Sequence, residues 1–469
     1  MLFNTFNFWI IYPLLFIIYW VIPYQYVKIK KWYLVILSYL LYMNYKPAYA
    51  LILFSVTAIT YCGALYLQHK EKKKLLIFIL TLASILPLLI FKYYNFLNDT
   101  IINILSLYGM HANLPGLNWA IPVGISFFTF QALGYLFDVY FGKIKPEKCF
   151  TDYMLFCSFF PQIASGPISK ASELLPQIKE THPFSYTQAK KGLWLLLWGM
   201  FIKLFIADRL GLYVDVVFGH FTYYSGLTCF IASIFYTIQI YCDFCGYSLM
   251  AVGIGKTLGY DLIENFNRPY FAASITEFWK RWHISLTRWL TSYIYIPLGG
   301  NRCSKLRCYF NIMITFLVSG LWHGANWTFI IWGIFHGIIQ IIEKYFGIQK
   351  ANRNNSLTTI FRILVTFIIV NFAWIFFRMP TLEDAISIIH RIFTNHETSL
   401  YYASLGDLLL YIIGISILFM KEFHEEFTSP KYLGIFNQRY IKWGICIFLF
   451  GAMLCEGVLD SGNFIYVSF

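Results

Sequence analysis

Long apolar runs separated by short polar segments dominate this chain. A span across the hydrocarbon core of a bilayer needs about 20 apolar residues, and runs near that length recur from one end to the other. They predict an all-α, polytopic membrane protein with about 10–12 membrane helices. Several runs are shorter, so some helices are expected to be tilted, re-entrant or interfacial. The runs cover residues 8–23, 33–45, 49–67, 75–91, 119–137, 190–207, 226–242, 309–322, 327–346, 358–377, 406–420 and 439–455.

Two stretches break this pattern. Residues 149–185 contain prolines and glycines among short apolar pieces, and residues 255–305 mix cations with aromatic rings. Polar groups are tolerated at membrane depth only where protein or water surrounds them. The two stretches therefore predict a protein interior with a funnel or tunnel. No soluble segment or low-complexity linker stands out, so we expect residues 1–469 to form a single membrane domain.

The composition agrees with a bilayer as solvent. Of the 469 residues, 58% are hydrophobic and 13% are charged, and the mean hydropathy is +0.60. Average soluble domains carry about 25% charged residues, so this composition excludes an ordinary soluble fold. Aromatic residues make up 21% of the chain, which suits the two interfaces of a membrane.

The net charge of +13 is gathered in short clusters between apolar runs. Lys28, Lys30 and Lys31 form one cluster, and residues 70–74 form another. Positive-inside bias and contact with anionic membrane lipids explain these clusters better than a nucleic-acid partner. We expect both clusters on the cytoplasmic side of a bacterial plasma (inner) membrane, which makes the N-terminus extracytoplasmic. The first run lacks the basic start and cleavage site of a signal peptide, so it is interpreted as a retained membrane helix.

The ten cysteines indicate neither a disulfide framework nor a metal site. Cys242 and Cys245 have the C-x-x-C spacing of redox and metal sites, but small buried residues of a membrane helix are the simpler interpretation. Cys303 and Cys308 are five apart and do not supply the second pair of a zinc ribbon. No bound metal is expected.

The strongest chemical candidate is His323, in the segment LWHGANW at residues 321–327. An ionisable residue at membrane depth is costly and usually serves a function or pairs with a partner. Neutral histidine is the least costly of these residues and can accept a proton near pH 7. The pattern fits a general base inside the membrane. A histidine that merely joins two helices by hydrogen bonds is the alternative.

His336 lies 13 residues further along. On one continuous helix it is about 220° around and about 20 Å away from His323, so the two could not form a catalytic pair. A helix break at Gly324 changes this geometry. We interpret His336 as structural or tunnel-lining.

Lys203 and Asp208 are five apart in an apolar run, a spacing unsuited to an α-helical pair, so each is predicted to pair with another helix.

His283 stands among cations and tryptophans in WKRWHIS, residues 279–285. Interleaved rings and cations can stack on a nucleotide and hold its phosphates. The residues alone favour another interpretation, an amphipathic helix at the lipid headgroups with its cations directed to water. The members of this candidate site are Lys280, Arg281, Trp282, His283 and Arg288.

Long motifs in this region resemble the membrane-bound O-acyltransferase superfamily, in particular its bacterial alginate O-acetyltransferase branch. The flanking segments MLFN (1–4), GISFFTFQ (124–131) and FPQIASGP (160–167) agree. The resemblance extends from residue 1 to about residue 380. The central motifs are QIYCDFCGYS (239–248), ENFNRPY (264–270), SITEFWKRWHIS (274–285), YIYIPLGGNR (293–302) and GLWHGANWTF (320–329).

The resemblance implies a funnel of helices with a catalytic histidine in a tunnel, which corresponds to His323. It places His283 and Asn267 in the same tunnel. It also implies acetyl-CoA or a similar thioester as a cytoplasmic co-substrate, and no resident cofactor. It further implies an extracytoplasmic partner, often of the SGNH-hydrolase type, that completes transfer to a glycan acceptor. Leu249 and the pair Thr291–Ser292 depart from the relatives, which often carry Asp and Arg-Asp there.

These features lead to one mechanistic hypothesis. A thioester enters from the cytoplasm with Lys280, Arg281 and Arg288 near its phosphates, and His323 deprotonates an acceptor hydroxyl. Asn326 or a tryptophan N–H, such as that of Trp322, stabilises the oxyanion. D-alanyl transfer to teichoic acid is the nearest rival. A transporter or flippase with His323 in a proton path and a scaffold without activity are rivals of other classes.

Overall fold

The computed structural model describes residues 3, 5–68, 73–110, 115–348, 356–427, 439–458 and 465. All regular elements in these ranges are helical, which confirms the all-α prediction. The first half of the chain contains α1 (Phe6–Val21), α2 (Val27–Met43), α3 (Tyr49–Leu67), α4 (Lys73–Leu88), α5 (Tyr94–Leu107), α6 (Ile125–Tyr140), α7 (Phe150–Ser158), α8 (Phe160–Ile163), α9 (Ala171–Lys179), α10 (Tyr186–Phe201) and α11 (Asp208–Gly219).

The second half contains α12 (Gly226–Thr257), α13 (Ile275–Arg281), α14 (Ile284–Leu290), α15 (Lys305–His323), α16 (Trp327–Tyr345), α17 (Ser356–Arg378), α18 (Leu382–Thr394), α19 (Leu405–Phe427) and α20 (Arg439–Glu456). Short segments of other helix types connect these helices. The π-helical ones are η1 (Leu89–Tyr93), η2 (Ile202–Ala207) and η5 (Thr291–Tyr295), and the 3-10 ones are η3 (Phe221–Tyr223) and η4 (Pro269–Phe271).

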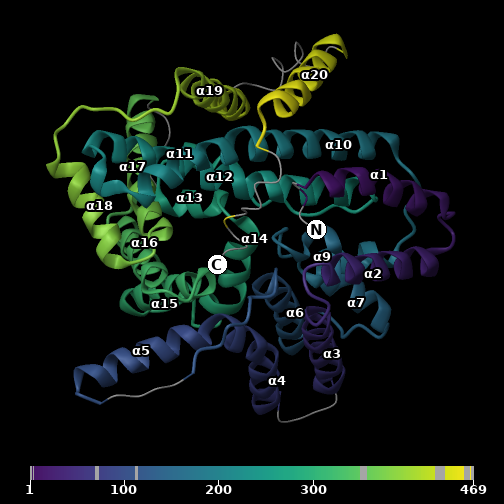
Figure 1. Ribbon diagram of the computed structural model, residues 1–469. Helices are drawn as coiled ribbons and strands as arrows, with labels where there is room; N and C mark the ends of the chain where they lie inside the picture. The colour runs from purple at the N-terminus through teal and green to yellow at the C-terminus, as the bar shows by residue number, and fades with distance from the viewer. Residues whose placement is uncertain are drawn as a thin grey trace.

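Three groups of helices pack around a buried centre (Figure 1). Helices α1, α10 and α12 lie side by side, α3, α4 and α6 form a second group below them, and α15 to α18 form a third at one side. Helices α19 and α20 lie along the outer edge of the first group. Almost every side chain of α6 is buried, so this helix occupies the core between the groups.

Glycines at the contact between α10 and α12 allow the two helix backbones to approach closely. A Cβ atom on Gly199 would lie 2.6 Å from the carbonyl oxygen of Gly246, and one on Gly192 would lie 2.7 Å from that of Gly253. Small residues at such contacts let helix backbones approach where lipid gives little hydrophobic drive for association. The long helix α12 begins with Ser225, whose side chain accepts a hydrogen bond from the N–H of Thr228 at 3.1 Å.

Each of the twelve predicted apolar runs overlaps a helix, although the run at 119–137 begins six residues before α6. Four helical stretches of the described chain are long and apolar enough to cross a membrane, fewer than the 10–12 expected. The others are shorter, less apolar or more highly charged than such a span requires. The four stretches are Tyr49–Leu67, Lys73–Leu107, Gly226–Thr257 and Leu357–Arg378.

The two irregular stretches fold into short buried helices. Residues 149–185 contain α7, α8 and α9, and residues 255–305 contain α13, α14 and η5. Their buried positions within the helical groups agree with the prediction that they line the protein interior.

One sequence-based expectation for charged residues needs correction. Lys203 bonds Asp208 at 2.6 Å, because η2 is π-helical and its wider turn brings residues five apart together. The expectation that this spacing is unsuited to a pair is therefore wrong, whereas Lys203 does pair with another helix, through Asp243 on α12. In the first basic cluster, Lys30 is buried 4.3 Å from the centre of the Trp20 ring and Lys31 bonds Asp152. Residues 69–72, in the second cluster, lie outside the described ranges.

Candidate active site

His323 is the last residue of α15, at the tip of a tight helical hairpin. Gly324 follows in an extended conformation, and α16 begins at Trp327. Gly320 and Gly333 lie where the two helices touch: a Cβ atom on Gly320 would be 2.4 Å from the carbonyl oxygen of Phe329. The break at Gly324 therefore occurs, so the single-helix separation of His323 and His336 does not apply.

Aromatic rings surround the imidazole of His323, which is 3% exposed. Ring centres lie 4.9 Å away for Trp322, 5.0 Å for Trp332 and 5.2 Å for Phe377. Such a wall keeps the imidazole away from bulk water and restricts its rotation. These are conditions that a positioned general base requires.

His283 lies against the same site. Its ring centre is 6.4 Å from that of His323, and Phe127, Phe244 and Trp322 complete its surroundings. The two histidines, 40 positions apart in the sequence, thus meet in one buried pocket of rings.

An unusual turn presents His283. Its backbone adopts φ 42°, ψ 54°, a left-handed conformation rare for residues other than glycine. Asn265 holds this turn: its carbonyl accepts from the N–H of Ile284 at 2.9 Å, and its Oδ1 accepts from the N–H of Ser285 at 3.1 Å. Asn267, the residue suggested by the resemblance, instead donates its backbone N–H to the carbonyl of Arg281 and has an exposed side chain.

His336 lies behind Trp332. The centre of the Trp332 ring is 5.0 Å from that of each of His323 and His336, so the indole lies between the two imidazoles. Trp279 donates its indole N–H to His336 Nδ1 at 3.4 Å. This bond leaves the proton of a neutral imidazole on Nε2, which suits a structural role better than that of a base.

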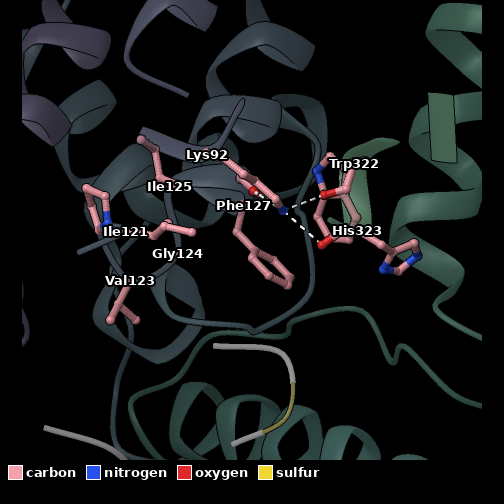
Figure 2. Close-up of a pocket in the computed structure, with 10 residues that line it drawn as sticks. Lys92, Ile121, Val123, Gly124, Ile125, Phe127, Trp322 and His323 are labelled. Carbon is pink, nitrogen blue, oxygen red and sulfur yellow. Dashed lines mark hydrogen bonds between the residues drawn. The ribbon is translucent and has the colours of Figure 1, made fainter. Parts of the chain in front are cut away.

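A hollow opens beside the end of α15 (Figure 2). Residues 121–127, which lead into α6, form one wall, and Lys92, Trp322 and His323 form the other. The ammonium group of Lys92 donates to the carbonyl oxygens of Trp322 at 2.7 Å and of His323 at 2.9 Å. In Figure 2 the imidazole of His323 projects away from Lys92, toward the aromatic interior.

A second, more basic hollow is lined in part by Phe130 on α6 and by residues of α14, which follows His283. Lys170, Ser285, Arg288 and Trp289 are among its lining residues. Burial, together with the neighbouring Arg288 cation, lowers the pKa of Lys170. Arg288 also pairs with Glu173 at the rim, where both side chains are partly exposed.

The other predicted donor-binding residues are not brought to these hollows. Lys280 is exposed, and Trp282 is buried with its ring centre 4.9 Å from that of Trp374. Arg281 bonds Glu277 and Glu426, both at 2.8 Å, so acidic side chains occupy its guanidinium group.

The two residues predicted to stabilise an oxyanion, Asn326 and Trp322, differ in whether their hydrogen-bond donors are available. Asn326 caps α16: its Oδ1 accepts from the N–H of Thr328, and its Nδ2 donates to the carbonyl of Pro380. Both polar atoms are therefore committed to the backbone. The indole N–H of Trp322 is buried beside His323 without a hydrogen-bond partner in the described part of the chain.

Sequence reasoning did not single out three residues of this site. Lys92 carried a signal, since it is a lone cation at the end of an apolar run. Asn265 lies in a quoted motif, but nothing in its spacing distinguishes it from Asn267. Lys170 becomes notable only once the fold brings it to Arg288.

Metal chemistry has no evident site here. Among the described residues, no group of three or more His, Cys, Asp or Glu side chains is placed to hold an ion. Cys242 and Cys245 are free thiols buried on α12, consistent with their interpretation as small interior residues of a helix.

Comparison with known proteins places this site in a family. The family model of membrane-bound O-acyltransferases matches residues 115–382, more than half of the chain, including α6 to α17 and both histidines. The chain belongs to the membrane-bound O-acyltransferase family. It is therefore an acyltransferase of the membrane, and the resemblance noted from its motifs is confirmed.

Individual relatives share most of this chain. It is 33% identical to the probable alginate O-acetylase of Pseudomonas aeruginosa over 85% of this chain and 78% of that protein. It is 35% identical to the peptidoglycan O-acetyltransferase of Helicobacter pylori over 80% of this chain and 76% of the relative. Identity to the teichoic acid D-alanyltransferase of Bacillus subtilis is 28%, over 63% of this chain and 76% of the relative.

Proposed function

We propose that this acyltransferase moves acetyl groups from acetyl-CoA toward the hydroxyl groups of a cell-surface glycan, with His323 as the catalytic residue. The observation that carries the proposal is the pair of imidazoles, His323 and His283, enclosed 6.4 Å apart in a pocket of aromatic rings. Relatives named for O-acetylation of alginate and of peptidoglycan support acetyl as the group and a glycan as the acceptor.

The reaction follows from these side chains. His323 takes the proton of the acceptor hydroxyl as its oxygen attacks the thioester carbonyl, a role worth roughly 10²–10⁴ in rate. The oxyanion that forms accepts a hydrogen bond from the indole N–H of Trp322, which has no described partner. The C–S bond then breaks, and the thiolate of coenzyme A recovers the proton from His323.

The two hollows suggest where the substrates enter. We assign the donor to the hollow with Lys170 and Arg288, because cations there can meet the phosphates of coenzyme A. Arg288 remains from the sequence-based set of phosphate ligands, and Lys170 takes the place of Lys280 and Arg281. We assign the acceptor to the hollow beside residues 121–127. An extracytoplasmic partner of the SGNH-hydrolase type, in a bacterial plasma membrane, completes the scheme.

Thioester turnover tests the proposal. The protein is purified in detergent with labelled acetyl-CoA, and release of CoA is followed with and without a soluble hydroxyl acceptor. His323→Ala is expected to lower turnover by about 10²–10⁴, the usual contribution of a general base. His220→Ala, at an exposed position, is the matched control and should keep wild-type turnover.

Each outcome has a definite meaning. Equal turnover in wild type and His323→Ala contradicts the assignment of His323 and directs attention to His283. Turnover only with an acyl carrier-protein thioester favours D-alanyl-type transfer, as in the relative from Bacillus subtilis. A transporter or a scaffold predicts no thioester cleavage with either donor, and a scaffold also predicts full function for His323→Ala in cells.

A further inference from the structure

The C-terminal end of α15 needs hydrogen-bond donors from elsewhere in the protein. The last carbonyl groups of a helix have no partner within it, and a left-handed glycine commonly satisfies them. Here Gly324 is extended, with φ −164° and ψ 153°, so that cap does not form. The N–H of Gly324 reaches the carbonyl of Gly320, which leaves the carbonyls of Leu321, Trp322 and His323 to be satisfied by other groups.

Two neighbouring residues of η1 supply those donors. The ammonium group of Lys92 donates to the carbonyls of Trp322 and His323, at 2.7 and 2.9 Å (Figure 2). The hydroxyl of Tyr93 donates to the carbonyl of Leu321. The ammonium group of Lys92 also donates a third, longer hydrogen bond to Ser126 Oγ on α6, at 3.5 Å. One π-helical turn thus ties three consecutive carbonyls of α15 to the core.

The charge of Lys92 suits this position. Lys92 is buried, and no carboxylate of the described ranges forms an ion pair with it. Its cation instead faces the negative end of the α15 dipole. An ammonium group so far from water is costly and tends to persist where it serves a function. π-helical turns inside longer helices are likewise common at functional sites.

We propose that Lys92 is a positioning residue for His323. By fixing the last turn of α15, it directs the imidazole into the pocket formed by Trp322, Trp332 and Phe377. Lys92 is not a catalytic residue, since its ammonium group contacts the backbone of His323 while the ring projects the other way. The inference rests on the proposed function of His323.

Kinetics of matched variants test the role. Lys92→Met keeps the length of the side chain and removes its donors, and we expect kcat to fall about 10- to 100-fold because a small misplacement of a base is costly. KM for acetyl-CoA should change less than about twofold, since the donor hollow is untouched. Lys92→Arg should recover part of kcat, because a guanidinium group can donate to two oxygens. Lys30→Met, at a buried lysine remote from the site, should keep wild-type kcat.

A second readout does not depend on activity. Diethylpyrocarbonate modifies accessible imidazoles, and mass spectrometry reports the modified fraction of His323. We expect slow modification in wild type and in Lys30→Met, and modification several-fold faster in Lys92→Met. Tyr93→Phe, which removes one hydroxyl, should show a smaller change of the same kind. If Lys92→Met does not fold, the modification rate of His323 in Tyr93→Phe decides whether these hydrogen bonds position His323.

The proposal is overturned if kcat and the modification rate of His323 are unchanged in the folded variants. A raised KM with unchanged kcat also overturns it, because Lys92 then binds substrate. Equal losses in Lys30→Met overturn it as well. If turnover proves independent of His323, the proposed function fails, and the modification rates alone still decide whether Lys92 positions His323.

Discussion

Two left-handed residues mark the backbone of the candidate active site. His283 and Arg268 have φ values of 42° and 45°, and each costs about 1–2 kcal/mol relative to an ordinary conformation. They lie on adjoining segments, since Arg281 donates to the carbonyl of Arg268 and Asn265 holds the residues that follow His283. Such strain persists where surrounding contacts enforce it, and it is frequent at catalytic sites. Here it presents the His283 ring to His323.

Matched substitutions at His283 test this strain. His283→Gly and His283→Ala remove the same imidazole, but only glycine adopts a positive φ freely. We expect His283→Gly to be more stable than His283→Ala by about 1 kcal/mol, the reverse of the usual order within helices. Thermal unfolding in detergent measures the difference. An alanine variant equal to or more stable than the glycine variant contradicts an enforced left-handed conformation.

At the scale of elements, glycines set the distance between α15 and α16. Cβ atoms on Gly320 and Gly333 would lie 2.4 and 2.5 Å from carbonyl oxygens of the facing helix, whose backbone has no flexible end to move aside. The same contacts bring His323 and Trp332 together at the tip of the hairpin. Close packing of two helices and placement of the candidate base are therefore one structural feature.

An added methyl group should separate these helices. Gly333→Ala is expected to destabilise the protein by about 1–3 kcal/mol, as overpacking commonly does, and to lower thioester turnover because His323 moves. Gly444→Ala on α20 is the control, since its Cβ atom meets nothing within 4 Å. Thermal midpoints and turnover of the two variants are compared. Equal stability of Gly333→Ala and wild type argues against the close contact.

At the scale of the whole molecule, the regions beyond the family match are tied to the site. Helix α19 follows the matched residues 115–382, and its Glu426 bonds both Arg268 and Arg281. These arginines flank the segments that hold His283. Helix α19 therefore supports the segments that hold His283, and Glu426 pairs with the guanidinium group of Arg281.

The basic clusters predict the orientation of the molecule. Lys28 is exposed next to the turn between α1 and α2, which we predict to be cytoplasmic. Tyr24→Cys, at a position that is 54% exposed in this turn, should react with a membrane-impermeant maleimide only after cells are permeabilised. Mass spectrometry separates this site from the exposed native cysteines Cys62, Cys149 and Cys455. Labelling in intact cells reverses the predicted orientation.

The sequence by itself determined the helices and the two histidines. Apolar runs mark helices because burying backbone in lipid requires internal hydrogen bonds, and this cost is local. His323 stands out because an ionisable group in apolar surroundings is costly, and His283 stands out because it lies among cations and aromatic rings. The twelve runs therefore correspond to helices, and both histidines lie in one site.

Only the tertiary structure decided how charged and polar residues are used. Lys203 meets Asp208 through a π-helical turn that α-helical periodicity does not anticipate. Arg281 reaches an acidic residue 145 positions away, and Lys92 reaches the carbonyl of Trp322 across 230 positions. Tertiary packing determines which residues become partners at such separations. For Lys92, packing brings a hydrogen-bond donor to carbonyl groups at a helix end that have no partner within the helix. The physical reason is that the burial of each residue is encoded locally, whereas the partner that makes burial tolerable is supplied by the fold.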